Sequence, residues 1–369
     1  MNRIGVMHIT DTLEAGGAEQ VAVNLANLLP RERFTSHLCT TRREGRLADE
    51  LTPDVGRLRL ARRWRLDGAA LRRMLAYIRE HEIKILHAHG SSIFTASVAS
   101  LFAPRTTIVW HDHYGLPLED RAAWVERPLA KRAGGIIAVS QPLAEWSRRK
   151  LAVAADRVWY IPNFVCLPQQ SNAPPPELPG EVGARIVCVA NLRPQKDHLT
   201  LVRAMAEVVG QVPAAHLLLV GAVVDASYRE AIEREIALLG LERHVSLLGE
   251  RRDVAAILRA CDVGVLSSIA EGLPLALIEY AQAGLASVAT RVGQCAEVLD
   301  EGRAGMLVPA QSPRALSAAL VKLLASPAER DALGGLIRER ARRLYSAGSI
   351  IERICQVYEV LLASKRGRG

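Results

Sequence analysis

Two series of alternating strands and helices, separated by a proline-rich stretch, constrain the fold of this 369-residue chain more than any other feature. Strand-like apolar runs of the first series lie at residues 3–10, 83–88, 107–110, 135–139 and 157–161. Those of the second series lie at residues 185–190, 216–221, 244–248, 263–266 and 286–290. Strands that alternate with helices favour parallel sheets, so the sequence predicts an α/β protein with two doubly wound domains.

The stretch between the two series has the composition of a linker. Residues 166–183 are rich in proline and polar residues and have no apolar periodicity. We therefore predict a first domain at residues 1–165, a second at 184–345, and a final helix within 346–369 that packs back on the first domain. In such a pair of domains, a shared ligand is expected in a cleft at the carboxyl ends of the strands.

Cysteine usage and hydropathy narrow the class of protein. The six cysteines are scattered without a CxxC spacing, and the amino terminus lacks a secretory pattern, so buried free thiols in a reducing cytosol are expected. The longest apolar stretches fall well short of the roughly 20 residues that a membrane-spanning helix needs.

Charge is concentrated in the first half of the chain. Residues 1–160 carry 24 Lys and Arg against 17 Asp and Glu, which accounts for +7 of the net +8. Within segment 57–73 the arginines are Arg57, Arg59, Arg62, Arg63, Arg65, Arg72 and Arg73. Such a segment suits an anionic membrane surface or an acidic acceptor, and it equally suits a solvated helix face. Nucleic-acid binding is not favoured, because aromatic residues are few and no recognition motif accompanies the charge.

The sharpest chemical feature is a pair of glutamates, Glu271 and Glu279, with seven residues between them. Glu271 lies in the predicted turn after a strand, where Gly272 permits close approach to the backbone. Pro274 suits the first position of the next helix, whose free amides can bind phosphate. Glu279 lies farther along that helix, where its carboxylate can accept hydrogen bonds from a ribose diol. An ordinary helix start with an acidic first turn is the alternative.

A second feature is the pair Arg193 and Lys196, directly after the first strand of the second series. Two cations at that position could neutralise a diphosphate and stabilise the negative charge that grows on a leaving phosphate oxygen. Alternatively, both are surface charges beside a helix cap at Asp197.

Together these motifs resemble the signature of the family 4 retaining glycosyltransferases of the GT-B fold. That family has two glutamates separated by seven residues and an Arg-x-x-Lys loop after the first strand of the donor domain. Further matching motifs are Gly16-Gly17-Ala18-Glu19, His87-Ala-His89-Gly90, Trp110-His111-Asp112-His113, Ile161-Pro162-Asn163 and residues 288–293. The resemblance extends over nearly the whole chain and implies two Rossmann-like domains facing each other across a cleft. Two positions depart from the family pattern, Phe164 and Gln294, where glycine is common.

The resemblance also implies roles for single residues. It assigns donor binding to Arg193, Lys196, Ser268, Glu271, Gly272, Leu273, Pro274, Leu275 and Glu279. In that set, Arg193 and Lys196 grip the diphosphate, Glu279 binds the ribose, and Glu271 lies near the hydroxyls of the donor sugar. The implied catalytic residues are Glu271, His111, Arg193 and Lys196. Gly16, Gly17 and His113 are assigned to the loops that face the acceptor and the phosphates, and His113 leaves open which histidine is the active-site one.

The implied activity is retaining transfer of a hexose from a nucleoside-diphosphate sugar, UDP- or GDP-linked, to a glycan or lipid-linked acceptor. We expect a role in cell-surface polysaccharide or glycolipid synthesis, in the cytoplasm or at the inner face of the cell membrane. No cofactor and no metal are expected, because no Asp-x-Asp motif is present and the His-x-His pair lacks further ligands at recognisable spacing.

Two other functions remain open: a nucleotide-sugar epimerase of similar fold, and a catalytically silent subunit that binds nucleotide sugar or glycan. A dehydrogenase is not favoured, because no Gly-x-Gly-x-x-Gly follows a predicted strand.

Overall fold

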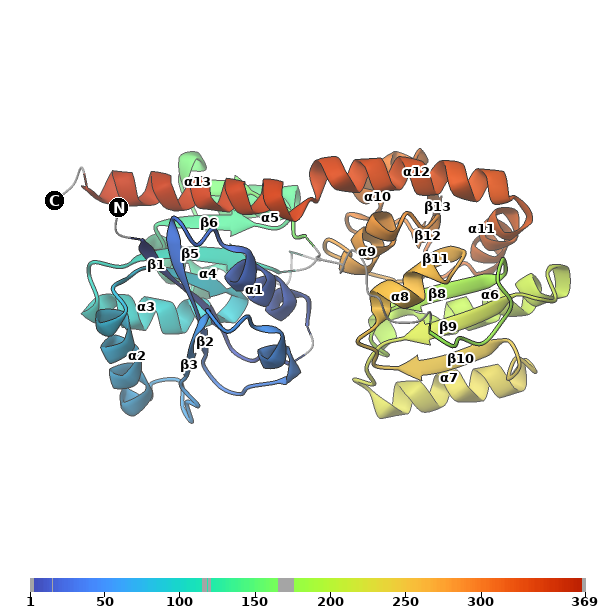
Figure 1. Ribbon diagram of the computed structural model, residues 1–369, viewed down its shortest axis with the longest axis horizontal. Coiled ribbons are helices and arrows are strands. Elements are labelled where there is room, and N and C mark those ends of the chain that lie inside the picture. Colours follow the sequence, from blue (N-terminus) through green and yellow to red (C-terminus); the bar gives the residue numbers. More distant parts are fainter. Residues whose placement is uncertain (1–2, 15, 115–117, 119–120, 165–175, 367–369) are drawn as a thin grey trace. The chain divides into compact units, whose positions relative to one another are not determined.

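The computed structural model describes residues 3–14, 16–114, 118, 121–164 and 176–366. The chain divides into two compact units, unit 1 with residues 1–164 and 347–369, and unit 2 with residues 165–346 (Figure 1). Residues 166–175 of the predicted linker lie outside the described residues. Each unit is an open parallel sheet covered by helices, which confirms the predicted α/β class with two doubly wound sheets.

Unit 1 has a seven-stranded parallel sheet in the order β3-β2-β1-β4-β5-β6-β7. Its strands are β1 (Ile4–Thr10), β2 (Phe34–Thr40), β3 (Gly56–Arg59), β4 (Ile83–His89), β5 (Thr107–Asp112), β6 (Gly135–Ala138) and β7 (Val158–Tyr160). Its helices are α1 (Gly17–Leu28), α2 (Gly68–Glu80), α3 (Ile93–Phe102), α4 (Ala123–Arg132), α5 (Gln141–Lys150) and α13 (Ala347–Arg366).

Unit 2 has a six-stranded parallel sheet in the order β10-β9-β8-β11-β12-β13. Its strands are β8 (Arg185–Val189), β9 (His216–Val220), β10 (Val245–Gly249), β11 (Val263–Leu266), β12 (Ser287–Thr290) and β13 (Met306–Val308). Its helices are α6 (His198–Gln211), α7 (Ala226–Leu238), α8 (Val254–Arg259), α9 (Leu275–Ala283), α10 (Cys295–Val298), α11 (Pro313–Ala325) and α12 (Pro327–Leu344).

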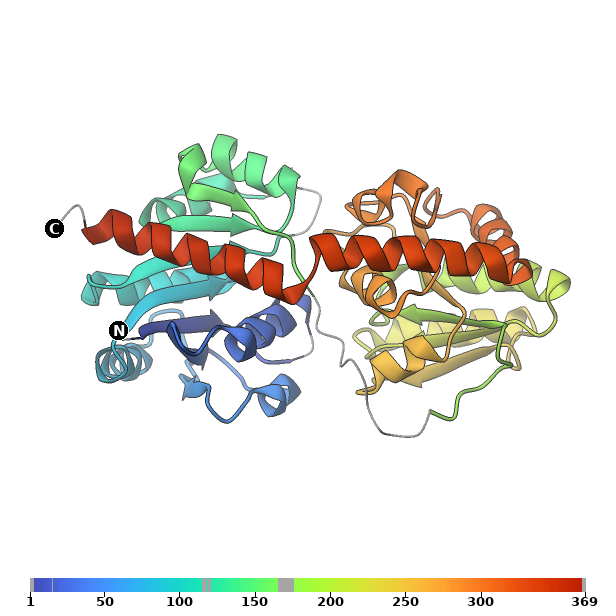
Figure 2. The same ribbon diagram turned by 45° about the horizontal axis from the view of Figure 1, so that its top comes forward.

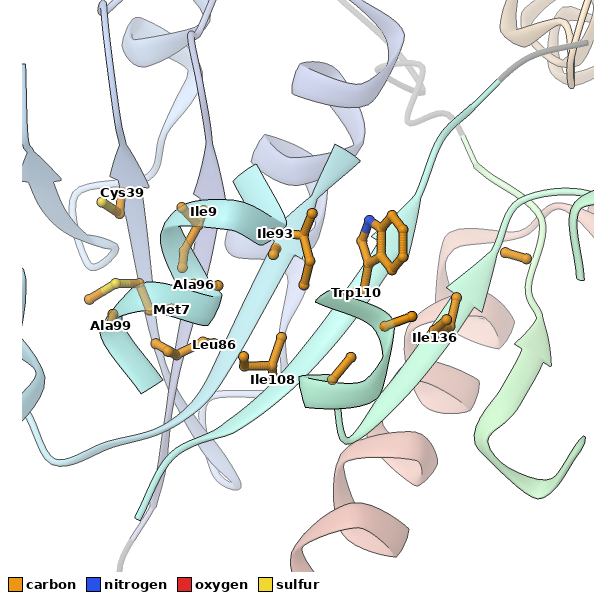
Figure 3. Packing of buried hydrophobic residues seen from close by; sticks show 14 of the residues in the cluster. Met7, Ile9, Cys39, Leu86, Ile93, Ala96, Ala99, Ile108, Trp110 and Ile136 are labelled. Carbon is orange, nitrogen blue, oxygen red and sulfur yellow. The ribbon is translucent and has the colours of Figure 1, made fainter. Parts of the chain in front are cut away.

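The central strands of each sheet are buried on both faces, as expected for parallel strands between helices. In unit 1, residues of β1, β4 and β5 such as Met7, Leu86 and Ile108 pack against α3 residues such as Ala96 (Figure 3). The strand order reverses between β1 and β4 in unit 1 and between β8 and β11 in unit 2. Ligands of doubly wound folds bind outside the carboxyl ends of strands at such reversal points, so a functional site is expected at these two places.

Three strands of the structure, β2, β3 and β13, are absent from the sequence prediction. β2 is almost fully buried although it contains Ser36, His37 and Thr40. These polar residues interrupt the apolar pattern by which a buried strand is recognised in a sequence. The Ser36 hydroxyl donates a hydrogen bond of 2.8 Å to the carbonyl of Ala26, which makes its burial tolerable. β3 and β13 are edge strands of four and three residues, too short to form a recognisable pattern.

The last helix, α13, belongs to unit 1 and lies along it (Figure 2). Arg33 forms ion pairs of 2.9 Å with Glu352 and 2.5 Å with Glu359. The fully buried hydroxyl of Tyr358 hydrogen-bonds to Nδ1 of His87 on β4. A face of buried apolar side chains, Tyr358 among them, and charged contacts at the surface therefore hold this helix against the rest of unit 1.

None of the described helices is long and apolar enough to span a bilayer. Cys39, Cys188, Cys261, Cys295 and Cys355 are buried free thiols, while Cys166 lies outside the described residues.

Candidate functional site

The loops after β8 and β11 meet at the carboxyl edge of the unit 2 sheet. These strands are neighbours, with Val263 of β11 paired to Ile186 of β8. The backbone amide of Ile269 donates to the carbonyl of Gln195 over 3.0 Å, and the Gln195 side chain donates back to the carbonyl of Ala270 over 2.9 Å. The two predicted motifs are therefore joined by hydrogen bonds and form one structure.

At the centre of this junction, Lys196 and Glu271 form a largely buried ion pair. Lys196 Nζ lies 2.6 Å from Glu271 Oε1, and the side chains are only 14% and 7% exposed. The Ser268 hydroxyl donates to the same oxygen over 2.6 Å. Charge-assisted hydrogen bonds of this kind are short and fix the position of a carboxylate. The surface-charge alternative does not hold for Lys196, although Asp197 does cap α6 by accepting from the Thr200 amide.

Arg193, the other predicted cation, is exposed. Within the described residues its guanidinium forms no hydrogen bond or ion pair, although its backbone carbonyl accepts from the Lys196 amide over 3.0 Å. Its guanidinium is thus available to a ligand at the edge of the junction, while the neighbouring cation, Lys196, is already held by Glu271.

The turn after Glu271 is shaped by a close backbone contact. Gly293 has a φ of +50°, and a Cβ there would lie 2.0 Å from the carbonyl oxygen of Glu271, so only glycine fits. The next residue, Gln294, donates its backbone amide to the carbonyl of Gly272 over 3.0 Å and has a φ of −93°. Gln294 therefore needs no glycine conformation, and this departure from the family pattern leaves the backbone contact intact.

The start of α9 offers free amides, as predicted, one residue later than expected. Pro274 is the N-cap rather than the first helical residue, with no side-chain cap, and Leu275 begins the helix. Amides of a first turn have no intrahelical acceptor. Those of Leu275 and Ala276 are therefore able to donate hydrogen bonds to an anion.

Glu279 lies one turn farther along α9 and is half-buried. Burial raises the pKa of its carboxyl from 4.5 to about 7. In the described part of the chain no group donates to this carboxylate. An acidic group held without a donor is able to accept hydrogen bonds from a ligand that carries hydroxyl groups.

In unit 1, five histidines gather at the carboxyl ends of β1, β4 and β5. We call His8, His87, His89, His111 and His113 the histidine cluster. Sheet register explains it, since His8 pairs with His87 and His89 pairs with His111. Burial lowers the pKa of every member, so all five rings are neutral at neutral pH.

Two hydrogen-bonded chains of imidazoles run through the cluster. In the first, Tyr358 contacts His87, whose Nε2 lies 3.0 Å from Nδ1 of His111. In the second, His8 Nδ1 lies 3.2 Å from Nε2 of His89, whose Nδ1 lies 3.0 Å from Nε2 of His113. The sequence prediction named His111 and His113 but missed His8, whose position at the end of β1 was the available signal. Tyr358 could not be found, because it is 271 residues from His87 in the chain.

The predicted glycine loop lies at the start of α1. Gly16 is the N-cap with extended backbone, and a Cβ there would lie 2.2 Å from the carboxylate of Glu19. Gly17 is the first helical residue. In the loops beside it, Asp11 accepts from Thr41 and Ser91 and pairs with Arg62 at 3.2 Å. The Arg62 side chain is only 7% exposed, so this arginine is a structural partner of Asp11 and not part of an exposed basic surface.

A further buried ion pair fixes the end of β5 beside His111. Asp112 and Arg121 approach to 2.6 Å with side chains 2% and 3% exposed. The guanidinium also stacks over the rings of Tyr114 and Trp146, 4.6 and 4.3 Å from their centroids. This pair, absent from the sequence prediction, secures the strand that positions His111.

Comparison with protein families gives two matches. The model described as Glycosyltransferase Family 4 matches residues 15–167, and the model described as Glycosyl transferases group 1 matches residues 183–326. Together they cover most of both units.

Relatives and solved structures agree with these matches. The chain is 27% identical to the phosphatidyl-myo-inositol mannosyltransferase of Mycolicibacterium smegmatis, over 81% of this chain and 77% of that protein. It is 27% identical to the MMP alpha-(1->4)-mannosyltransferase of Mycolicibacterium hassiacum, over 66% and 61% of the two chains. The crystal structure of Anabaena HepE in complex with UDP and glucose aligns with a TM-score of 0.81 at 18% identity, covering 97% of this chain and all of that one.

Proposed function

We propose that this chain, which belongs to the family 4 glycosyltransferases with a GT-B fold, transfers a hexose from a nucleoside-diphosphate sugar to a glycan or lipid-linked acceptor. The observation that carries the proposal is the buried Lys196–Glu271–Ser268 arrangement beside the free Arg193 and the amino terminus of α9. It combines cations and amides for a diphosphate with carboxylates for the hydroxyls of a sugar and a ribose.

Each part of the donor has a proposed partner in unit 2. Arg193 and Lys196 bind the diphosphate together with the first-turn amides of α9. Glu279 accepts hydrogen bonds from the ribose, and Glu271 orients the hydroxyls of the hexose. UDP or GDP is the expected carrier; a HepE structure contains UDP-glucose, which supports a donor of this class.

The proposed reaction retains the configuration of the anomeric carbon. The bond from that carbon to the leaving phosphate oxygen breaks, and a bond to the acceptor oxygen forms on the same face. The acceptor proton passes to the leaving phosphate, so no protein nucleophile is needed. Arg193 and Lys196 stabilise the charge that develops on the phosphate. Because protein cations do this, we expect transfer to persist in the presence of a chelator.

The donor site is tested by a thermal-shift screen against UDP, GDP, ADP, TDP and CMP. A ligand at about 100 times its dissociation constant adds roughly 2.7 kcal/mol to the free energy of unfolding. We expect one nucleoside diphosphate to raise the Tm of the wild type and an Arg193→Ala variant to lose most of that response. Arg234→Ala, which removes an exposed arginine on α7, is the matched control and should respond like the wild type.

The proposal would be contradicted if none of these nucleotides raised the Tm of the wild type. Once the base is identified, turnover of the nucleotide sugar is compared with and without an acceptor extract. An epimerase would react without acceptor, and a silent binding subunit would bind without reacting.

Nucleotide affinity is expected to rise with pH because of Glu279. Its pKa of about 7 leaves roughly a tenth of the carboxyl ionised at pH 6 and nine tenths at pH 8. If the ribose hydroxyls donate to the ionised form, affinity increases about tenfold between these pH values. Calorimetric titration of the wild type and Glu279→Gln checks this, since titration of the phosphate affects both proteins and only the wild type has the Glu279 contribution.

The same pKa shift has the opposite effect on the free protein. A carboxyl with a raised pKa contributes stability that is fully present below pH 4.5 and is lost as pH rises through about 7. The Glu279→Gln variant should lack this loss. If nucleotide affinity depends on pH equally in the wild type and in Glu279→Gln, Glu279 does not bind the ribose.

We propose in addition that unit 1 associates with anionic membrane through the loop that precedes α2. Trp64 and Leu66 are 75% and 73% exposed, and Arg63 and Arg65 beside them are exposed as well. Exposed aromatic and apolar side chains between arginines suit a lipid headgroup boundary. The mannosyltransferase relative named for phosphatidyl-myo-inositol supports a lipid-linked acceptor.

Substitution of Arg63, Trp64 and Arg65 by Ser should weaken binding to phosphatidylglycerol vesicles by at least about 30-fold. Two basic residues near an anionic surface contribute about 1 kcal/mol each. The control replaces Lys131, Arg149 and Trp124 by Ser, which removes the same charge and one exposed tryptophan elsewhere in unit 1. Co-sedimentation checks both variants, and an equal loss in the control would contradict the assigned surface.

A further inference from the structure

The histidine cluster holds more imidazoles than a single active-site histidine requires. Within it, His89, His111 and His113 can each offer a ring nitrogen within 4.8 Å of the others. The His-x-His spacing in the sequence conceals this, because the third ring comes from the neighbouring strand β4 and becomes adjacent only through the register of His89 with His111. We propose that His89, His111 and His113 form a binding site for a Zn²⁺-class transition-metal ion.

The distances between the ring centroids bring the three imidazoles close enough to share one ion. Zn²⁺ binds histidine nitrogen at about 2.0–2.1 Å in tetrahedral geometry, which puts neighbouring imidazole centroids about 5 Å apart. The centroid distances are 5.2 Å for His89 and His113, 5.3 Å for His89 and His111, and 4.2 Å for His111 and His113. The rings of His111 and His113 are stacked at an interplanar angle of 28°, and His89 Nδ1 is hydrogen-bonded to His113 Nε2. Binding of an ion therefore requires rotation of these rings and replacement of that hydrogen bond by metal coordination.

The remaining histidines, His8 and His87, hydrogen-bond to two of the proposed ligands. A metal-binding imidazole usually has its second nitrogen engaged by another group, which fixes the orientation of the ring. Nδ1 of His111 is engaged by His87, which in turn contacts Tyr358. Nε2 of His89 is engaged by His8. The rings of His111 and His89 are thus oriented by hydrogen bonds on the side away from the proposed ion.

Three ring nitrogens of the cluster, Nε2 of His8, Nε2 of His111 and Nδ1 of His113, are buried and have no hydrogen-bond partner among the described residues. Nε2 of His111 is the one that the proposed ion would engage. Leaving a buried polar atom without a partner costs roughly 1–3 kcal/mol, so such an atom calls for an explanation. Metal coordination through Nε2 supplies one, because Nδ1 of the same ring is already engaged by His87.

The ligand chemistry selects the class of ion. Three neutral imidazoles without a carboxylate suit Zn²⁺, Co²⁺, Ni²⁺ or Cu²⁺, whereas Mg²⁺ requires oxygen ligands. The nearby carboxylate of Asp112 is engaged by Arg121. Half-buried His113 gives the site its access, in contrast to the fully enclosed set His8, His87 and His89. Three protein ligands leave a fourth position for water or a ligand hydroxyl.

The experiment is equilibrium dialysis of metal-stripped full-length protein against Zn²⁺, with visible absorption of Co²⁺ as a second measurement. We expect one Zn²⁺ per chain, the absorption bands of tetrahedral Co²⁺, and no comparable binding of Mg²⁺. His113→Gln should weaken Zn²⁺ binding by at least about 100-fold, more than loss of an outer partner does. His244→Gln, a half-buried histidine in unit 2, is the matched control and should bind like the wild type.

His113→Gln is tested further only if its near-ultraviolet circular dichroism matches that of the wild type, and His111→Gln takes its place otherwise. Zn²⁺ binding that survives in the folded variant would overturn the proposal, as would absence of stoichiometric binding by the wild type. A greater loss in His8→Gln than in His113→Gln would assign the ion to the other three histidines and also overturn it. Because the measurement is metal binding to unit 1, its outcome is independent of the nucleotide test on unit 2.

Discussion

Substitution of Lys196 by Ala is expected to lower kcat/KM for sugar transfer by about 100- to 1,000-fold. Removal of one preorganised group that stabilises developing charge costs this much in other enzymes. Here the substitution removes a cation from the proposed diphosphate site and also the partner that lies 2.6 Å from Glu271. The measurement is initial-rate kinetics with the nucleotide sugar identified by the thermal-shift screen.

Lys322→Ala is the matched control for this variant. Lys322 pairs with Glu329 at 2.7 Å on the surface of unit 2, with 59% of its side chain exposed. Loss of an exposed pair of this kind changes stability by at most about 1 kcal/mol and should leave turnover unchanged. If Lys196→Ala folds normally and keeps its transfer rate within about threefold of the wild type, the assigned role of Lys196 is wrong.

Substitution of Arg121 by Ala is expected to lower the free energy of unfolding by about 3–5 kcal/mol. Removing one partner of a buried ion pair leaves the other charge buried without compensation. Asp112 is 2% exposed at its side chain, so water cannot replace the guanidinium. The variant also loses the stacking of Arg121 over Trp146 and Tyr114. Urea unfolding followed by tryptophan fluorescence and circular dichroism measures the loss.

Arg149→Ala provides the comparison, because Arg149 pairs with Glu145 at 3.0 Å while 76% of its side chain is exposed. A loss below about 1 kcal/mol is expected for it. The double variant Arg121→Ala/Asp112→Ala should recover part of the lost stability, since the buried carboxylate of Asp112 is gone and only Glu126, the more exposed second partner of Arg121 at 2.7 Å, is left unpaired. If Arg121→Ala is no more destabilising than Arg149→Ala, Asp112 does not depend on its partner.

The success of the sequence prediction follows the strength of each local signal. β1, β4 and β8 are apolar runs beside glycine turns, and the structure has them within about a residue of the expected bounds. β2 was missed because a strand buried among helices can contain serine and histidine when their polar atoms find partners inside the protein. The fold class was nevertheless predictable, because alternation of strands and helices survives the loss of one strand.

The candidate site was predictable only in part, for a different reason. Arg193, Lys196, Glu271 and Glu279 were recognised from motifs, and the structure brings Lys196 and Glu271 together. The ion pair itself could not be predicted, because it joins loops 75 residues apart through the adjacency of β8 and β11. In the basic segment 57–73, residues of one type lie in different environments. Its arginines appear alike in sequence, yet Arg62 is buried against Asp11 while Arg63 and Arg65 are exposed.

The return of α13 to unit 1 affects the order in which the protein can be completed during synthesis. Residues 1–164 leave the ribosome first, but the helix that contributes Tyr358 to His87 and two glutamates to Arg33 follows all of unit 2. Until then His87 lacks the Tyr358 hydroxyl, and the sheet face under α13 is uncovered. The nascent first unit therefore exposes apolar surface to chaperones, whereas the second unit, which is contiguous in sequence, can finish folding. Unit 1 is therefore the later of the two to mature, although its synthesis begins first.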